Sequence, residues 1–126
     1  MSLVLVIDDD PMMRSLMARL IESMGHTTMT AENGEDGLAL FEQFRPALVV
    51  TDLVMPLGGG DELIPRIRRI VPDVKIIAVS GRAVTGSAEE ARLLAADAMV
   101  GKPFRVAEFI GTIDNILGRS NICLSS

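Results

Sequence analysis

Polar residues directly follow four apolar segments of the chain, and together they carry groups suited to binding a phosphoryl group. They provide three carboxylates, an alcohol and an amine: Asp8 and Asp9 after 3–7, Asp52 after 48–51, Ser80 after 76–79, and Lys102 after 99–101. In an open parallel sheet, the carboxyl ends of all strands open onto one edge. Residues far apart in the sequence can therefore meet there and form one site.

The three carboxylates indicate a divalent cation. At one sheet edge Asp8, Asp9 and Asp52 would repel one another, which would raise their proton affinity unless a cation lies among them. Oxygen ligands favour a hard ion. Mg²⁺ commonly binds one or two carboxylates while it shares phosphate oxygens. The sequence therefore predicts a magnesium site.

Length and composition are typical of one globular domain. The chain has 126 residues, 48% hydrophobic and 23% charged, as expected for such a domain. The net charge of −5 disfavours direct nucleic-acid binding, which depends on clustered Lys and Arg.

Apolar stretches are shorter than the roughly 20 residues that span a bilayer. Cys123 is the only cysteine, which excludes an internal disulfide. We therefore expect a cytoplasmic protein without a membrane segment.

Apolar periodicity alternates along the chain between short continuous runs and helical spacing. The runs predict strands at 3–7, 26–31, 47–51, 74–79 and 98–100, and the spaced stripes predict helices at 11–24, 37–44, 63–71, 88–96 and 106–117. Five strand–helix units with short right-handed crossovers indicate a doubly wound α/β domain. The expected fold is a five-stranded parallel sheet in the order 2-1-3-4-5 between two helix layers, a flavodoxin-like (βα)5 sandwich.

The motifs and their spacing resemble those of a response-regulator receiver domain. The resemblance rests on Asp8-Asp9 after the first strand, segment 51–56 around Asp52, Ser80-Gly81 after the fourth strand, and Lys102-Pro103-Phe104 after the fifth. It covers the chain from Leu3 to about Leu117. Residues 1–118 are therefore expected to form a receiver domain, with residues 119–126 as a C-terminal tail.

The resemblance implies a ligand set for the metal. Asp9 and Asp52 would bind Mg²⁺ directly, together with the backbone carbonyl of Val54. Asp8 would act mainly through water.

The resemblance also implies a reaction. Asp52 would be the nucleophile that takes a phosphoryl group from a phosphohistidine and forms an acyl phosphate. The donor would be a sensor histidine kinase or a histidine phosphotransfer protein. The Lys102 ammonium and the Ser80 hydroxyl would stabilise the transferring oxygens. Apart from self-catalysed phosphotransfer and autodephosphorylation, no enzymatic activity is expected.

The output of such a domain would be a conformational switch. Phosphorylation would rearrange the face formed by the fourth helix, the fifth strand and the fifth helix. A downstream protein target or an attached output domain would read that change, with the domain a monomer or a phosphorylation-dependent dimer. The family usually has an aromatic residue three positions before the lysine, where this chain has Met99. We therefore expect weaker or differently wired coupling.

Three alternatives fit the sequence less well. A phosphatase with an aspartate nucleophile needs a second acid two residues later, and Val54 at that position cannot protonate a leaving group. A flavin-binding domain of the same topology would use aromatic rings, but the chain has no Trp or Tyr. A receiver-like interaction module that signals without phosphorylation would not need all four motifs.

Other residues receive structural interpretations. Asp10 before Pro11 is expected to cap the first helix. His26 is expected to be an ordinary edge-strand side chain, and no role is assigned to it. An exposed Met12 would indicate a protein contact. A basic run on the third helix is expected to be a solvated face: Arg66, Arg68 and Arg69.

Overall fold

The computed structural model describes residues 1–53, 55, 59–81 and 95–118. The elements are β1 (Leu3–Ile7), α1 (Pro11–Ser23), β2 (Thr27–Ala31), α2 (Gly34–Phe44), β3 (Leu48–Asp52), α3 (Gly60–Ile70), β4 (Lys75–Ser80), β5 (Ala98–Gly101) and α5 (Val106–Leu117). The helix expected at 88–96 falls almost entirely on residues 88–94, which lie outside the described residues.

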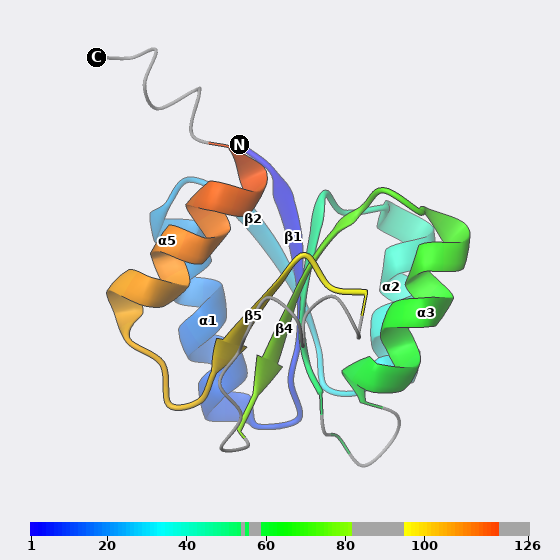
Figure 1. Ribbon diagram of the computed structural model, residues 1–126, viewed down its shortest axis with the longest axis horizontal. Helices are drawn as coiled ribbons and strands as arrows, with labels where there is room; N and C mark the ends of the chain where they lie inside the picture. Colours follow the sequence, from blue (N-terminus) through cyan, green and yellow to red (C-terminus); the bar gives the residue numbers. More distant parts are fainter. Residues whose placement is uncertain (54, 56–58, 82–94, 119–126) are drawn as a thin grey trace.

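The five strands form one parallel sheet in the order β2-β1-β3-β4-β5. Helices α1 and α5 cover one face of the sheet, and α2 and α3 cover the other (Figure 1). This confirms the predicted doubly wound fold. Because all strands run in the same direction, their carboxyl ends meet at one edge of the sheet.

Each face of the sheet has its own apolar core, because alternate strand residues point to opposite faces. In β1, Leu5 and Ile7 pack into a cluster with residues of α2 and α3, including Phe41 and Ile64. The intervening residues of β1 belong to a second cluster with Met17, Ile21, Phe109 and Ile113 of α1 and α5: Val4 and Val6. Burial on both faces explains the unbroken apolar run of β1.

The start of α1 follows the sequence expectation. Asp10 is the N-cap, and its Oδ1 accepts a hydrogen bond of 3.0 Å from the backbone N–H of Met12. Pro11 is the first helical residue, where its missing N–H costs no hydrogen bond. The cap therefore fixes the direction in which the chain leaves β1, just after Asp8 and Asp9.

Two details differ from the sequence expectation. Asp52 and Ser80 are the last residues of β3 and β4, so the strands reach one residue further than predicted. His26 precedes β2, and its Nδ1 accepts a hydrogen bond of 3.0 Å from the backbone N–H of Ser2. The sequence expectation places His26 in the edge strand, whereas β2 begins one residue later, at Thr27. None of the helices in the described ranges is long and apolar enough to cross a membrane.

Candidate functional site

Three aspartates lie together at the carboxyl edge of the sheet. Asp8 and Asp9 follow β1, and Asp52 ends β3, which pairs directly with β1. Each residue offers a carboxylate oxygen, and these oxygens all lie within 4.8 Å of one another. Adjacent strands therefore bring together side chains that are more than forty positions apart in the sequence.

Lys102 joins two of these carboxylates. Its Nζ lies 2.8 Å from Oδ2 of Asp8 and 3.1 Å from Oδ2 of Asp52. The Lys102 side chain is 18% exposed, and that of Asp8 is fully buried. Burial alone would lower the pKa of Lys102, but the hydrogen bonds and charges of Asp8 and Asp52 outweigh it and raise the pKa above its usual value. The ammonium therefore stays charged near neutral pH.

The loop that carries Asp8 is held by two further hydrogen bonds. The backbone N–H of Asp10 donates to Oδ1 of Asp8 over 2.9 Å, and Nη1 of Arg14 donates to the backbone carbonyl of Asp8 over 2.8 Å. Sequence reasoning missed Arg14. Its place six residues after Asp8 was the available signal, but its partner is a backbone carbonyl, which the residue types do not reveal.

Ser80 lies at the same edge, buried at the end of β4. Its carbonyl accepts a hydrogen bond of 2.7 Å from the backbone N–H of Lys102. On its other side β4 pairs with β3, where Val79 is the partner of Asp52. Ser80 thus lies between the strand that ends in Asp52 and the strand that leads to Lys102. Val54, expected to supply a metal-binding carbonyl, lies outside the described residues.

The charges of this cluster suit a divalent cation. Three carboxylates and one ammonium leave two negative charges, and two of the carboxylates are almost completely buried: Asp8 at 0% and Asp52 at 6% exposure. Leaving charge on buried carboxylates without compensation is costly. Asp9 is exposed, so the cluster is open on one side. Hard cations bind sites of this oxygen-only kind.

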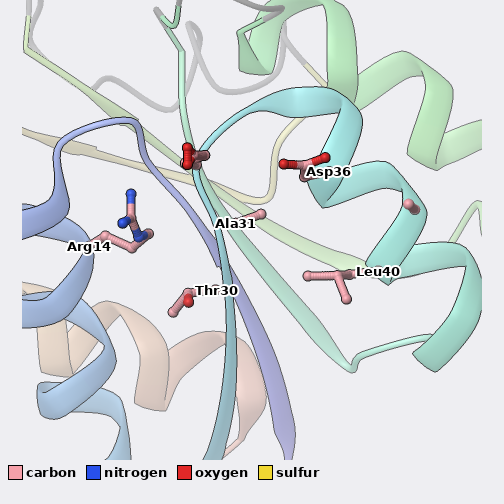
Figure 2. Close-up of a pocket in the computed structure, with 7 residues that line it drawn as sticks. Arg14, Thr30, Ala31, Asp36 and Leu40 are labelled. Atoms are coloured by element: carbon pink, nitrogen blue, oxygen red, sulfur yellow. The ribbon is translucent and has the colours of Figure 1, made fainter.

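A hollow beside the cluster, between α1, β2 and α2, is a different feature. It has a volume of about 450 Å³ and is lined by Arg14, Thr30, Ala31, Glu32, Asp36, Ala39 and Leu40. Figure 2 shows Arg14 on the α1 side, with Asp36 and Leu40 on the α2 side. The acidic cluster and Lys102 do not line this hollow. The chemistry argued below therefore belongs to the cluster.

Comparison with known proteins decides the family. The family model described as the response regulator receiver domain matches residues 4–114. The chain belongs to this family. Receiver domains are signalling modules of two-component systems and are generally not enzymes. Aspartate phosphorylation and Mg²⁺ are typical of them.

The relatives differ in how much of their own length this chain matches. The polar-differentiation response regulator DivK of Brucella anthropi is 32% identical over 120 residues, covering 91% of this chain and 95% of the relative. The transcriptional regulator NtrC of Azospirillum brasilense is also 32% identical, over 90% of this chain, but this receiver spans only 24% of its length. The match to DivK covers almost a whole protein, and the match to NtrC covers one part of a longer protein.

Solved structures agree with this assignment. The receiver domain of NtrX from Brucella abortus superposes with a TM-score of 0.83 at 28% identity, covering 90% of this chain and 97% of that chain. The receiver domain of the Francisella response regulator 1452 gives a TM-score of 0.85 at 26% identity, covering 95% and 99%. Their agreement extends over nearly all of the present receiver.

Proposed function

We propose that Asp52 is the phosphoacceptor of this receiver and takes its phosphoryl group from a phosphohistidine. The observation that carries the proposal is the convergence of Asp8, Asp9 and Lys102 around the Asp52 carboxylate. Asp52 is the member of the cluster that both contacts the ammonium and ends the strand in the middle of the sheet.

The reaction balances without a further reactant. A carboxylate oxygen of Asp52 bonds to phosphorus as the phosphorus–nitrogen bond of the donor breaks, and the imidazole leaves with the electron pair. The Lys102 ammonium, 3.1 Å from Oδ2 of Asp52, is placed to balance charge on the transferring oxygens. Ser80 at the end of β4 would donate its hydroxyl hydrogen to one of them. The carboxylates of Asp9 and Asp52 and the backbone carbonyl of Val54 would hold Mg²⁺, with Asp8 acting mainly through water, and the bound ion would supply positive charge to offset the remaining negative charge.

The relatives and one exposed side chain support an inference about partners. One relative is the sensor kinase CckA of Brucella abortus, 33% identical over 94% of this chain and 13% of its own length. We infer that a sensor histidine kinase or a histidine phosphotransfer protein supplies the phosphoryl group, and that a downstream protein or an attached output domain responds. Met12, four residues after Asp8, is 80% exposed, as expected of a residue at a protein contact.

The remaining expectations belong to this proposal. Residues 1–118 form the signalling domain and 119–126 a tail, and the protein acts in the cytoplasm as a monomer or a phosphorylation-dependent dimer. Self-catalysed phosphotransfer and autodephosphorylation are its only reactions. Met99, half-buried against the α2–α3 core, takes the place of the aromatic residue usual in the family and couples the site to the partner surface less strongly.

The test is to incubate the protein with a small acyl phosphate and Mg²⁺ and measure its intact mass. We expect the wild type to gain one phosphoryl group and Asp52→Asn to gain none. Asp73→Asn is the matched control, because this exposed turn residue loses the same charge away from the site. A chelator should abolish labelling of the wild type. Equal labelling of wild type and Asp52→Asn would refute the assignment, and no labelling of the wild type would favour signalling without phosphorylation.

A further inference from the structure

The placement of Lys102 depends on a short strand. β5 has four residues, Ala98–Gly101, and is the last strand of the sheet, so it pairs with β4 alone. Lys102 follows immediately. A register slip of one residue would move the chain by about 3.3 Å and would turn every side chain of β5 to the opposite face. Such a slip would remove the Lys102 ammonium from Asp8 and Asp52.

Arg68 of α3 contacts the segment that leads into β5. Its Nε and Nη2 donate to the carbonyl of Ala95 over 3.0 and 2.9 Å, and Nη2 also lies 2.9 Å from Oδ2 of Asp97. Nη1 donates to the carbonyls of Pro72, over 3.0 Å, and Val74. A guanidinium has five N–H groups, and all five are used here. The solvated-face interpretation was therefore wrong for Arg68, whereas Arg66 and Arg69 are exposed as expected.

Asp97 bonds the same segment to β4. Its Oδ2 accepts a second hydrogen bond, of 2.7 Å, from the backbone N–H of Ile76. The backbone N–H of Asp97 donates to the carbonyl of Ile76 over 2.8 Å. The segment before β5 is thus bonded to β4 through Asp97 and to α3 through Arg68. In Figure 1 this yellow segment turns towards the face of the sheet that α3 covers.

The two ends of β5 are therefore held in different ways. At the carboxyl end, the N–H of Lys102 donates to the carbonyl of Ser80 over 2.7 Å, a backbone bond that a slipped register could replace. At the amino end, the guanidinium fork of Arg68 requires Ala95 and Asp97 at defined positions. The side chains of Arg68 and Asp97 are 21% and 29% exposed, so this pair is partly shielded from water.

We propose that Arg68 is a positioning residue for Lys102: by fixing Ala95 and Asp97 it sets the register of β5, and thereby the contact of the Lys102 ammonium with Asp8 and Asp52. The effect of Arg68 on phosphotransfer rests on the function proposed above for Asp52. Arg68 itself lies on α3, near the start of β4, and the hydrogen bonds found for it in the described part of the chain do not include the reacting groups.

The test compares Arg68→Gln with Arg69→Gln, which removes the same charge from the neighbouring exposed position. At saturating Mg²⁺ and a temperature where all variants are folded, we expect Arg68→Gln to be labelled by a small acyl phosphate about 10- to 100-fold more slowly, the effect of a small displacement of a catalytic group. Arg69→Gln should match the wild type. The Mg²⁺ affinity of Arg68→Gln, measured by calorimetry, should not fall.

Two further variants test whether Arg68 affects labelling through Lys102. In a Lys102→Ala background, Arg68→Gln should slow labelling no further, because both substitutions remove the same interaction. Arg68→Lys should not restore the rate, since an ammonium cannot replace the fork. If Arg68→Gln does not fold, Asp97→Asn provides the test. The asparagine keeps an acceptor for the backbone N–H of Ile76. Asp97→Asn should therefore also slow labelling, but by a smaller factor than Arg68→Gln.

Hydrogen exchange gives a readout independent of phosphorylation. The amides of Asp97 and Lys102, bonded to Ile76 and Ser80, should exchange on the order of tenfold faster in Arg68→Gln than in Arg69→Gln, relative to amides of β1. Wild-type rates in Arg68→Gln, or slowing that persists in the Lys102→Ala background, would overturn the proposal. If the wild type is not labelled at all, the phosphoacceptor function fails, and exchange at Lys102 alone decides whether Arg68 sets the register.

Discussion

At the scale of single residues, the site is a balance between buried carboxylates and one amine. Asp8 has no exposed surface, and its partners in the described part of the chain include the Lys102 ammonium and the N–H of Asp10. Removal of one partner from a buried charge leaves the other uncompensated. Lys102 therefore affects both the stability of the protein and the binding of cations.

We expect Lys102→Ala to lower the free energy of unfolding without metal by about 1–3 kcal/mol, the cost of losing a hydrogen-bonded partner from buried carboxylates. Because the cluster then has one more uncompensated negative charge, Mg²⁺ should raise the unfolding temperature of the variant more than that of the wild type. Thermal unfolding with and without millimolar Mg²⁺ measures both effects. A smaller Mg²⁺ effect in the variant would show that Lys102 does not compete with the cation.

His26 should make stability depend on pH. Burial and the N-terminal ammonium lower its pKa against the opposing effect of Asp114, and its Nδ1 can accept from Ser2 only when it is unprotonated. Stability from this group is therefore present above the unfolded pKa of about 6.5 and is lost as the pH falls through the lower folded pKa. We expect unfolding temperatures of His26→Gln to change less between pH 7 and pH 5 than those of the wild type. Identical pH profiles would contradict this.

At the scale of elements, close packing of α2 on β1 requires a glycine. A Cβ built on Gly37 would lie 2.4 Å from Cδ1 and 3.0 Å from Cγ1 of Ile7. Ile7 is fully buried and directly precedes Asp8, so strain at this contact would reach the site. On α5, a Cβ built on Gly111 would meet nothing within 4 Å.

These two glycines give a matched pair of alanine substitutions. Gly37→Ala should lower the free energy of unfolding by about 1–2 kcal/mol, because overpacking of about 1–3 kcal/mol exceeds the gain in helix propensity. Gly111→Ala should raise it by about 0.5–1 kcal/mol. Urea unfolding measures both. In Gly37→Ala, Ile7→Val should recover part of the loss by removing Cδ1. Stabilisation by Gly37→Ala would show that α2 can move away from β1 at little cost.

Elements could be predicted from the sequence wherever a local pattern defines them. The apolar run of β1, the Asp10-Pro11 cap and the stripe of α1 are signals within a few residues, and each element appears where expected. The contacts of Arg68 and His26 could not be predicted in this way. Arg68 bonds to carbonyls up to 27 positions away, and His26 bonds to a backbone N–H 24 positions away. Backbone groups are the same at every residue, so the residue types do not reveal which backbone group a side chain will bond to.

At the scale of the whole molecule, parallel strand order turns separate motifs into one site. The order β2-β1-β3-β4-β5 puts β1 beside β3, and the Asp8, Asp9 and Asp52 carboxylates meet at their ends. This convergence could be predicted because fold and motif position together determine it. The bridging of two carboxylates by Lys102 could not, since it depends on side-chain geometry at β5.

The proposed domain boundary after residue 118 gives a prediction for the whole chain. Among the described residues, the members of both cores and of the acidic cluster lie between residues 4 and 113. If residues 119–126 are a tail, a chain that ends at Gly118 should unfold within about 2 °C of the longer chain, since a loss of 1 kcal/mol would shift the midpoint of a domain of this size by more than that. Calorimetry of the two chains makes the comparison. A larger loss would mean that residues 119–126 belong to the domain.

The central claim is that phosphoryl transfer ends on Asp52 rather than on another carboxylate of the cluster. After reaction with a small acyl phosphate and Mg²⁺, borohydride reduction converts a phosphorylated aspartate to homoserine, and peptide mass spectrometry then locates it. We predict homoserine at position 52 only, with Asp8 and Asp9 unchanged and no conversion when a chelator is present. Homoserine at position 8 or 9, or conversion that persists without metal, would contradict the account.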